Sequence, residues 1–133
     1  MANRDFSALV GCEVRQVGVD YQVRLVLVDG PYQDERVNAE LVIEAPFRYK
    51  AEDRKWHDIQ PGQVTTLGPV VTMFGRTVQA VTFDGLILTV DFGHDVRIEV
   101  ATMTHYESWN LSGTGVPGYI AGPWDLNEEL ESP

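Results

Sequence analysis

Apolar and polar residues alternate over most of residues 77–111. Successive side chains of a β-strand lie on opposite faces, so this period of two predicts strands with one buried face. Asp84-Gly85 precedes one alternating run, and Asp-Gly favours a tight hairpin turn. The segment therefore predicts an antiparallel meander, whose apolar positions are Leu86, Leu88, Val90 and Phe92 and, after a turn at 93–95, Val96, Ile98 and Val100.

The first third of the chain has the same alternation over residues 13–29 and 37–44. Asp29-Gly30-Pro31 breaks the pattern between these runs, and Pro46 ends the second because proline cannot donate to a sheet ladder. Short helical segments are predicted for residues 6–10 and 67–75. The second segment has a proline near its start and a glycine at its end, which is the usual asymmetry of helix termini.

Residues 9–20 and 73–84 share a spacing of glycine, apolar residues and aspartate. This spacing predicts two related halves, residues 5–47 and 67–122, each a short helix followed by a β-meander. Each half alone would expose a hydrophobic sheet face, so the two should share one core about a pseudo-twofold axis. A chance likeness between two amphipathic sheets is the alternative. The polar residues 48–66 are interpreted as an exposed connector and residues 125–133 as an acidic tail.

The predicted fold class is therefore α+β, mostly antiparallel β, in a single domain spanning residues 1–133. That length is usual for one domain and is sufficient to bury a core without disulfides or metals. Cys12 is the only cysteine, which excludes an internal disulfide and fits a reducing compartment. The sequence shows neither a leading apolar run nor an 18-residue apolar stretch, so we expect a cytoplasmic protein with no signal peptide and no membrane span.

The charge balance is strongly acidic, with 20 Asp and Glu against 10 Lys and Arg, a formal charge of −10. Proteins that bind phosphates need basic surfaces, so nucleic acids and anionic membranes are disfavoured partners. Solubility alone accounts for such a charge in many proteins. The alternative is a basic protein partner, whose association the acidic field would accelerate.

No catalytic motif stands out. Cys12 lies beside a glycine without a family signature, which favours a buried structural thiol. His57, His94 and His105 lack the spacing of metal ligands. The glycines of residues 112–122 lack the strand and helix that flank a phosphate-binding loop. We therefore predict a non-enzymatic protein without a cofactor or a metal.

The segment Tyr106-Glu107-Ser108-Trp109-Asn110-Leu111-Ser112-Gly113 carries a family resemblance. Together with residues 84–93 and the start Leu9-x-Gly11, it resembles a family of small, uncharacterised actinobacterial proteins. The resemblance covers most of residues 6–122 and implies no catalysis. Some relatives look like immunity proteins encoded beside secreted toxins. The family commonly ends in Pro-Gly-Gly, whereas this chain has Ala121-Gly122-Pro123-Trp124, so no role is assigned to that end.

These observations predict an acidic binding protein, and most specifically an immunity protein that blocks a cationic toxin domain. Acids on the polar strand faces would form the contact surface and aromatic residues would anchor the partner, although a tryptophan on an alternating strand is also typical of a core. One alternative is a small-ligand-binding or enzymatic domain with a cavity between the sheet halves. Another is a structural homodimer. The predicted contact residues are Asp91, Asp95, Glu99, Tyr106, Glu107 and Trp109.

Overall fold

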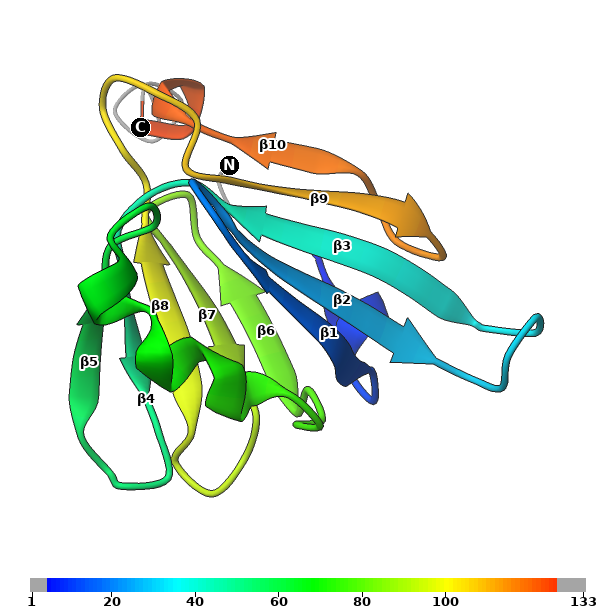
Figure 1. Ribbon diagram of the computed structural model, residues 1–133. Coiled ribbons are helices and arrows are strands. Elements are labelled where there is room, and N and C mark those ends of the chain that lie inside the picture. The colour runs from blue at the N-terminus through cyan, green and yellow to red at the C-terminus, as the bar shows by residue number, and fades with distance from the viewer. Residues whose placement is uncertain (1–4, 127–133) are drawn as a thin grey trace.

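The computed structural model describes residues 5–126 as two five-stranded antiparallel sheets with short 3₁₀ helices (Figure 1). Mostly antiparallel β structure is thus confirmed. Residues 5–66 contain η1 (Ser7–Leu9), β1 (Glu13–Val19), β2 (Val23–Asp29), β3 (Val37–Ile43), β4 (Phe47–Lys50), β5 (Trp56–Ile59) and η2 (Val64–Thr66). Residues 67–126 contain η3 (Gly68–Met73), β6 (Ala80–Phe83), β7 (Ile87–Asp91), β8 (Arg97–Ala101), β9 (Trp109–Thr114) and β10 (Tyr119–Ala121).

Each sheet combines strands from both ends of the chain. Sheet A has the order β1-β2-β3-β9-β10, and sheet B has the order β5-β4-β8-β7-β6. After β3 the chain crosses to sheet B, where β4 pairs with β8, and after β8 it crosses to sheet A, where β9 pairs with β3. The two predicted meanders, β1-β2-β3 and β6-β7-β8, are therefore each extended by a hairpin from the other part of the chain (Figure 1).

The interpretation of residues 48–66 as a connector is wrong. This segment contains most of the β4–β5 hairpin and all of η2. Phe47, Tyr49 and Ile59 are buried in the core, whereas Arg48 and Asp58 face solvent. The charged residues made the segment look uniformly polar, although its apolar residues have the period of two that a half-buried strand requires.

The two sheets are joined at a seam between residues 11–14 and 75–78. The Gly11 amide donates to the Val78 carbonyl at 2.9 Å, and the Gly75 amide donates to the Val14 carbonyl at 2.8 Å. Both glycines have positive φ, +92° and +85°, a region that side chains disfavour. The helical segments expected before them are present as η1 and η3, which are 3₁₀ rather than α-helices.

The inner faces of both sheets contribute to one hydrophobic cluster. Its aromatic part packs edge to face, with the rings of Phe83 and Trp109 5.0 Å apart and nearly perpendicular. Trp109 is 1% exposed, so its prediction as a surface anchor is wrong. The residue begins β9 with its ring directed into the core, where Phe6 also packs against it. Cys12 is buried, as the sequence predicted.

Trp109 offers a direct test of this core. Trp109→Ala should lower the free energy of unfolding by about 3–5 kcal/mol, because it leaves a large cavity. Trp109→Phe should cost clearly less, because it also removes the indole Nε1, a buried donor that has no partner within residues 5–126. Urea unfolding measures both. Trp124→Ala, at a half-exposed tryptophan, is the control and should cost about 1 kcal/mol. Equal losses in the two alanine variants would contradict the packing described.

Candidate functional site

Three of the predicted contact residues lie on sheet B and its turns. Asp91 ends β7, Asp95 lies in the β7–β8 turn and Glu99 faces outward from β8. Asp91 has a structural role, since its Oδ1 accepts the Gly93 amide at 2.7 Å and stabilises the turn. Asp91 and Glu99 therefore lie on neighbouring strands, and Asp95 lies in the turn that joins these strands.

Bases from β4 and β8 neutralise much of this acidic surface. Lys50 Nζ lies 2.5 Å from Asp95 Oδ2, and this hydrogen bond holds the pKa of Asp95 below its ordinary value. Arg97 contacts the same carboxylate at 3.2 Å, and Arg48 Nη1 lies 3.6 Å from Glu99 Oε1. The outer face of sheet B is thus a mixed network of ion pairs rather than a bare acidic surface. The sequence does not predict these bases here, because the polar residues 48–66, which include Arg48 and Lys50, resemble a connector.

Tyr106 and Glu107 lie in the loop between β8 and β9, at the other end of β8 from Asp95 (Figure 1). Glu107 meets Glu44, the residue that follows β3. The hydrogen bond between their side chains, together with burial and charge repulsion, raises the pKa of Glu44. Asn110 Nδ2 donates to Glu107 Oε2 at 2.8 Å and orients that carboxylate. This pair is missed by sequence reasoning, because only the crossing from β8 to β9 brings the two glutamates together.

The outer face of sheet A combines acids with apolar side chains. Val28 and Val42 are only 6% exposed, although neither belongs to the central hydrophobic cluster, so outward-facing neighbours cover them. Strand pairing places Val26 beside Glu40, and Val42 in one row with Arg24, Asn110 and the half-exposed Ile120. We call this surface the sheet A face and define it by Val26, Glu40, Val42, Glu44, Glu107 and Ile120.

The carboxylates of the sheet A face have no basic partners among residues 5–126. Glu40, Glu44 and Glu107 form no ion pair there, whereas Asp95 and Glu99 on sheet B pair with Lys50, Arg97 and Arg48. The nearby Arg24 lies 3.9 Å from Asp20 instead. This surface is therefore the more acidic of the two outer faces.

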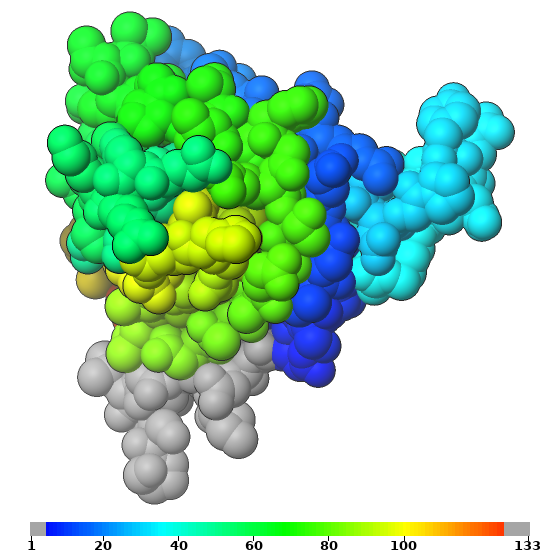
Figure 2. Space-filling view, turned by 90° about the horizontal axis from the view of Figure 1, so that it is seen from below, coloured from blue at the N-terminus to red at the C-terminus, as the bar shows by residue number. Residues whose placement is uncertain are grey.

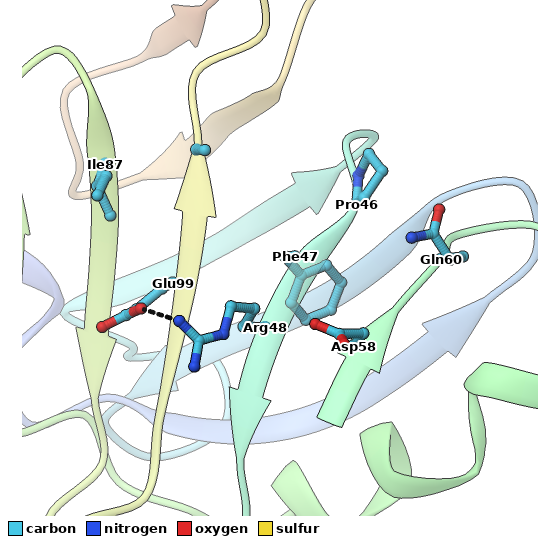
Figure 3. Close-up of a pocket in the computed structure, with 8 residues that line it drawn as sticks. Pro46, Phe47, Arg48, Asp58, Gln60, Ile87 and Glu99 are labelled. Carbon is cyan, nitrogen blue, oxygen red and sulfur yellow. Dashed lines mark ion pairs between the residues drawn. The ribbon is translucent and has the colours of Figure 1, made fainter. Parts of the chain in front are cut away.

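Two hollows open on the surface. A groove of about 310 Å³ crosses the outer face of sheet B and is lined by residues including Arg48, Asp58 and Glu99 (Figure 3). A second hollow of about 240 Å³ lies between the β4–β5 hairpin and η3, where His57 Nε2 is 2.9 Å from Asp53 Oδ2. Both lie outside the core, and not between the two sheets where a ligand cavity was the alternative expectation.

Among residues 5–126, Cys12 is the one thiol, and it is buried. Burial raises the pKa of the Cys12 thiol, which disfavours the reactive thiolate. The same residues contain no group of three or more histidine, cysteine, aspartate or glutamate side chains placed to hold a metal ion. In the described part of the chain, no helix is long and apolar enough to cross a membrane.

Asp125 corrects the prediction of a loose acidic tail from residue 125. It is buried, accepts the Gly122 amide at 3.0 Å and accepts a hydrogen bond from the Tyr119 hydroxyl. These bonds fasten the chain after β10 to the rest of the fold. The remaining acids of the predicted tail, in residues 127–131, lie outside the described residues.

The Glu44–Glu107 pair predicts a pH-dependent stability. The pKa of Glu44 is raised in the folded protein. The protonated Glu44 side chain therefore contributes to stability at pH values below its ordinary pKa of 4.5, and this contribution is lost as the pH rises through the raised pKa. Glu107→Gln removes the repulsion and leaves an amide oxygen for Asn110. The melting temperature of this variant minus that of the parent should therefore increase as the pH is raised from 4 to 7. A difference that is constant with pH would contradict the coupling.

The comparisons with known proteins point to a family rather than an activity. No curated protein and no solved structure matches the chain significantly. Residues 6–123 match DUF6188, a family of unknown function. This match confirms the expected resemblance to an uncharacterised domain family. Since it spans most of the sequence, the chain belongs to the DUF6188 family of unknown function.

Proposed function

We propose that this protein is a non-enzymatic binding protein for a basic protein partner, and that the sheet A face is its contact surface. The observation that carries the proposal is the Glu44–Glu107 pair. Ionisation of both carboxyl groups breaks the hydrogen bond between them and leaves two negative charges that repel, as the raised pKa of Glu44 indicates, and neither forms an ion pair within residues 5–126. A lysine or arginine of a partner would relieve this repulsion, so binding gains energy at this position.

The apolar residues of the same face support an interface. Val26 lies beside Glu40, and the half-exposed Ile120 lies at the end of the row that crosses from β3 to β10, so the acids have apolar neighbours, as in protein–protein interfaces. Tyr106 is 45% exposed in the loop that also carries Glu107, and tyrosine is enriched among the residues that dominate binding energy. Of the aromatic anchors expected from the sequence, Tyr106 is therefore retained.

In this proposal the partner does not contact Asp91, Asp95 or Glu99 directly. Two of these carboxylates are already paired with Lys50, Arg97 or Arg48, so a partner would have to displace an existing ion pair to bind them. Their remaining role would be to add to the acidic field that attracts a basic partner. A cationic toxin domain, neutralised by this protein in the cytoplasm, is the partner that the family resemblance favours.

The charge of the sheet A face disfavours the alternative of a homodimer through this surface. A twofold interface brings the same patch of two copies together, so the unpaired carboxylates of one copy would face those of the other. A basic partner removes this repulsion, whereas a second acidic copy increases it. The surface charge thus favours a heterologous partner.

We also propose that the two halves of the chain are diverged copies of one unit. Support comes from the order of the strands, since β1-β2-β3 with β9-β10 corresponds to β6-β7-β8 with β4-β5. The seam adds to this, because Gly11 and Val14 exchange hydrogen bonds with Val78 and Gly75 in a reciprocal pattern. On this view the outer faces of two equivalent sheets diverged, one toward unpaired acids and the other toward ion pairs.

The decisive experiment combines capture with matched charge variants. The immobilised protein should retain a basic protein from the lysate and secreted fraction of its host and release it at moderate salt. The double variant Glu44→Gln/Glu107→Gln should slow association with that protein about tenfold at low salt, because steering depends on local charge.

Glu52→Gln/Glu99→Gln is the control for this experiment. It removes the same net charge from acids that are already paired with Arg76 and Arg48, and it should slow association only slightly. Equal effects of the two double variants would mean that only the net charge of the protein affects association, and would contradict a specific role of the sheet A face. Capture of an acidic protein, or of none, would contradict the proposed partner.

A further inference from the structure

The groove on sheet B has the dimensions of a small-ligand site. Its volume of about 310 Å³ lies at the lower end of the range for pockets that bind small molecules. Strand pairing explains its construction: Asp58, Arg48 and Glu99 lie side by side on β5, β4 and β8. Figure 3 shows Arg48 between the other two, with Ile87 on β7 beyond Glu99.

Arg48 is held in place but retains its hydrogen-bonding capacity. Its guanidinium carbon lies 4.1 Å from the centre of the Trp56 ring, so the tryptophan supports one face of the cation. The ion pair with Glu99 is loose at 3.6 Å, and the guanidinium makes no hydrogen bond within residues 5–126. The side chain is 50% exposed. An oriented guanidinium with free donors suits a planar carboxylate, which it binds through two parallel hydrogen bonds.

The flanking acids determine what else the ligand must carry. Glu99 and Asp58 on either side of Arg48 would repel a simple anion, and Asp58 forms no ion pair within residues 5–126. A ligand that carries both a carboxylate and an ammonium group complements both charges of the groove. Its carboxylate would bind Arg48 and its ammonium group would bind Asp58. In an α-amino acid a single carbon separates these groups, which suits charges on neighbouring strands about 4.8 Å apart.

Apart from Gln60, the rest of the groove is apolar and favours an aliphatic side chain. Ala101 and Pro46 form a low floor, and the 43% exposed Ile87 forms a wall beside them. Burial of a leucine-sized side chain against these residues would contribute hydrophobic free energy. The small side chain of Ala101 leaves the space above β8 open.

We propose that this groove binds a free α-amino acid with an aliphatic side chain. The carboxylate contacts Arg48, the ammonium contacts Asp58, and the side chain lies on Ala101 and Ile87. The site is separate from the sheet A face, so it goes beyond the proposed function and neither proposal depends on the other. A bound amino acid adds a second recognition activity to the same fold.

The test is a titration of the ¹⁵N-labelled protein with L-leucine, followed by amide chemical shifts. Saturable shifts are expected at Asp58, Ile87 and Glu99. Removal of either ligand charge, in L-leucinamide or in N-acetyl-L-leucine, should weaken binding about tenfold or more, since a charge-assisted hydrogen bond contributes about 1.5–3 kcal/mol. Glycine should also bind more weakly, because it lacks the aliphatic side chain.

Two variants and a control assign the effect to the groove. Arg48→Met and Asp58→Asn should each weaken leucine binding by at least about tenfold. Arg24→Met, the same substitution on sheet A, should leave it unchanged, and the amide spectrum of each variant reports whether the fold is intact. The proposal is overturned if leucine causes no saturable shifts, if N-acetyl-L-leucine binds as tightly as leucine, or if the folded Arg48→Met and Asp58→Asn variants retain full affinity.

Discussion

The pairing of β4 with β8 determines much of the fold and of the surface charge. It places Tyr49 opposite Ile98 on the inner side of sheet B, where both are fully buried. On the outer side it places Arg48 opposite Glu99 and Lys50 opposite Arg97. The same backbone ladder therefore completes the core and brings basic side chains to acids on β8 and the adjoining turn. Without this crossing, the outer face of sheet B would lose two of its cations.

The two outer faces differ because the bases are distributed unevenly. Sheet B receives Arg48 and Lys50 from β4 and Arg97 from β8, and these residues hold Asp95 and Glu99 in ion pairs. On the sheet A face the nearest base, Arg24, lies opposite Val42 and pairs with Asp20, so Glu44 and Glu107 form no ion pair within residues 5–126. Exposed ion pairs contribute little stability, so the difference matters chiefly for recognition. The proposed partner of the unpaired face is a cationic protein, and the proposed ligand of the paired face is a small zwitterion. The narrow β2–β3 turn, drawn in cyan in Figure 2, extends away from the body of the molecule.

Several features follow from local sequence patterns. Alternation identified β2, β3, β7 and β8, and Asp84-Gly85 marked the β6–β7 turn, where the Asp84 carboxylate accepts the Leu86 and Ile87 amides at 2.8 and 2.9 Å. The glycines after the two helical segments marked positions with positive φ. These signals are readable because strand period and turn chemistry depend on residues close together in the chain.

The sequence by itself thus determined a mostly antiparallel β protein, the buried thiol of Cys12 and the overall acidity. Only the tertiary structure decided which strand joins which sheet, and with it the burial of Trp109, the contact between Glu44 and Glu107, and the groove around Arg48. The reason is physical: alternation fixes which residues share a face of one strand, but it does not specify the neighbouring strand. That choice is made by packing both hydrophobic faces into one core, and it sets the charges of the two outer faces.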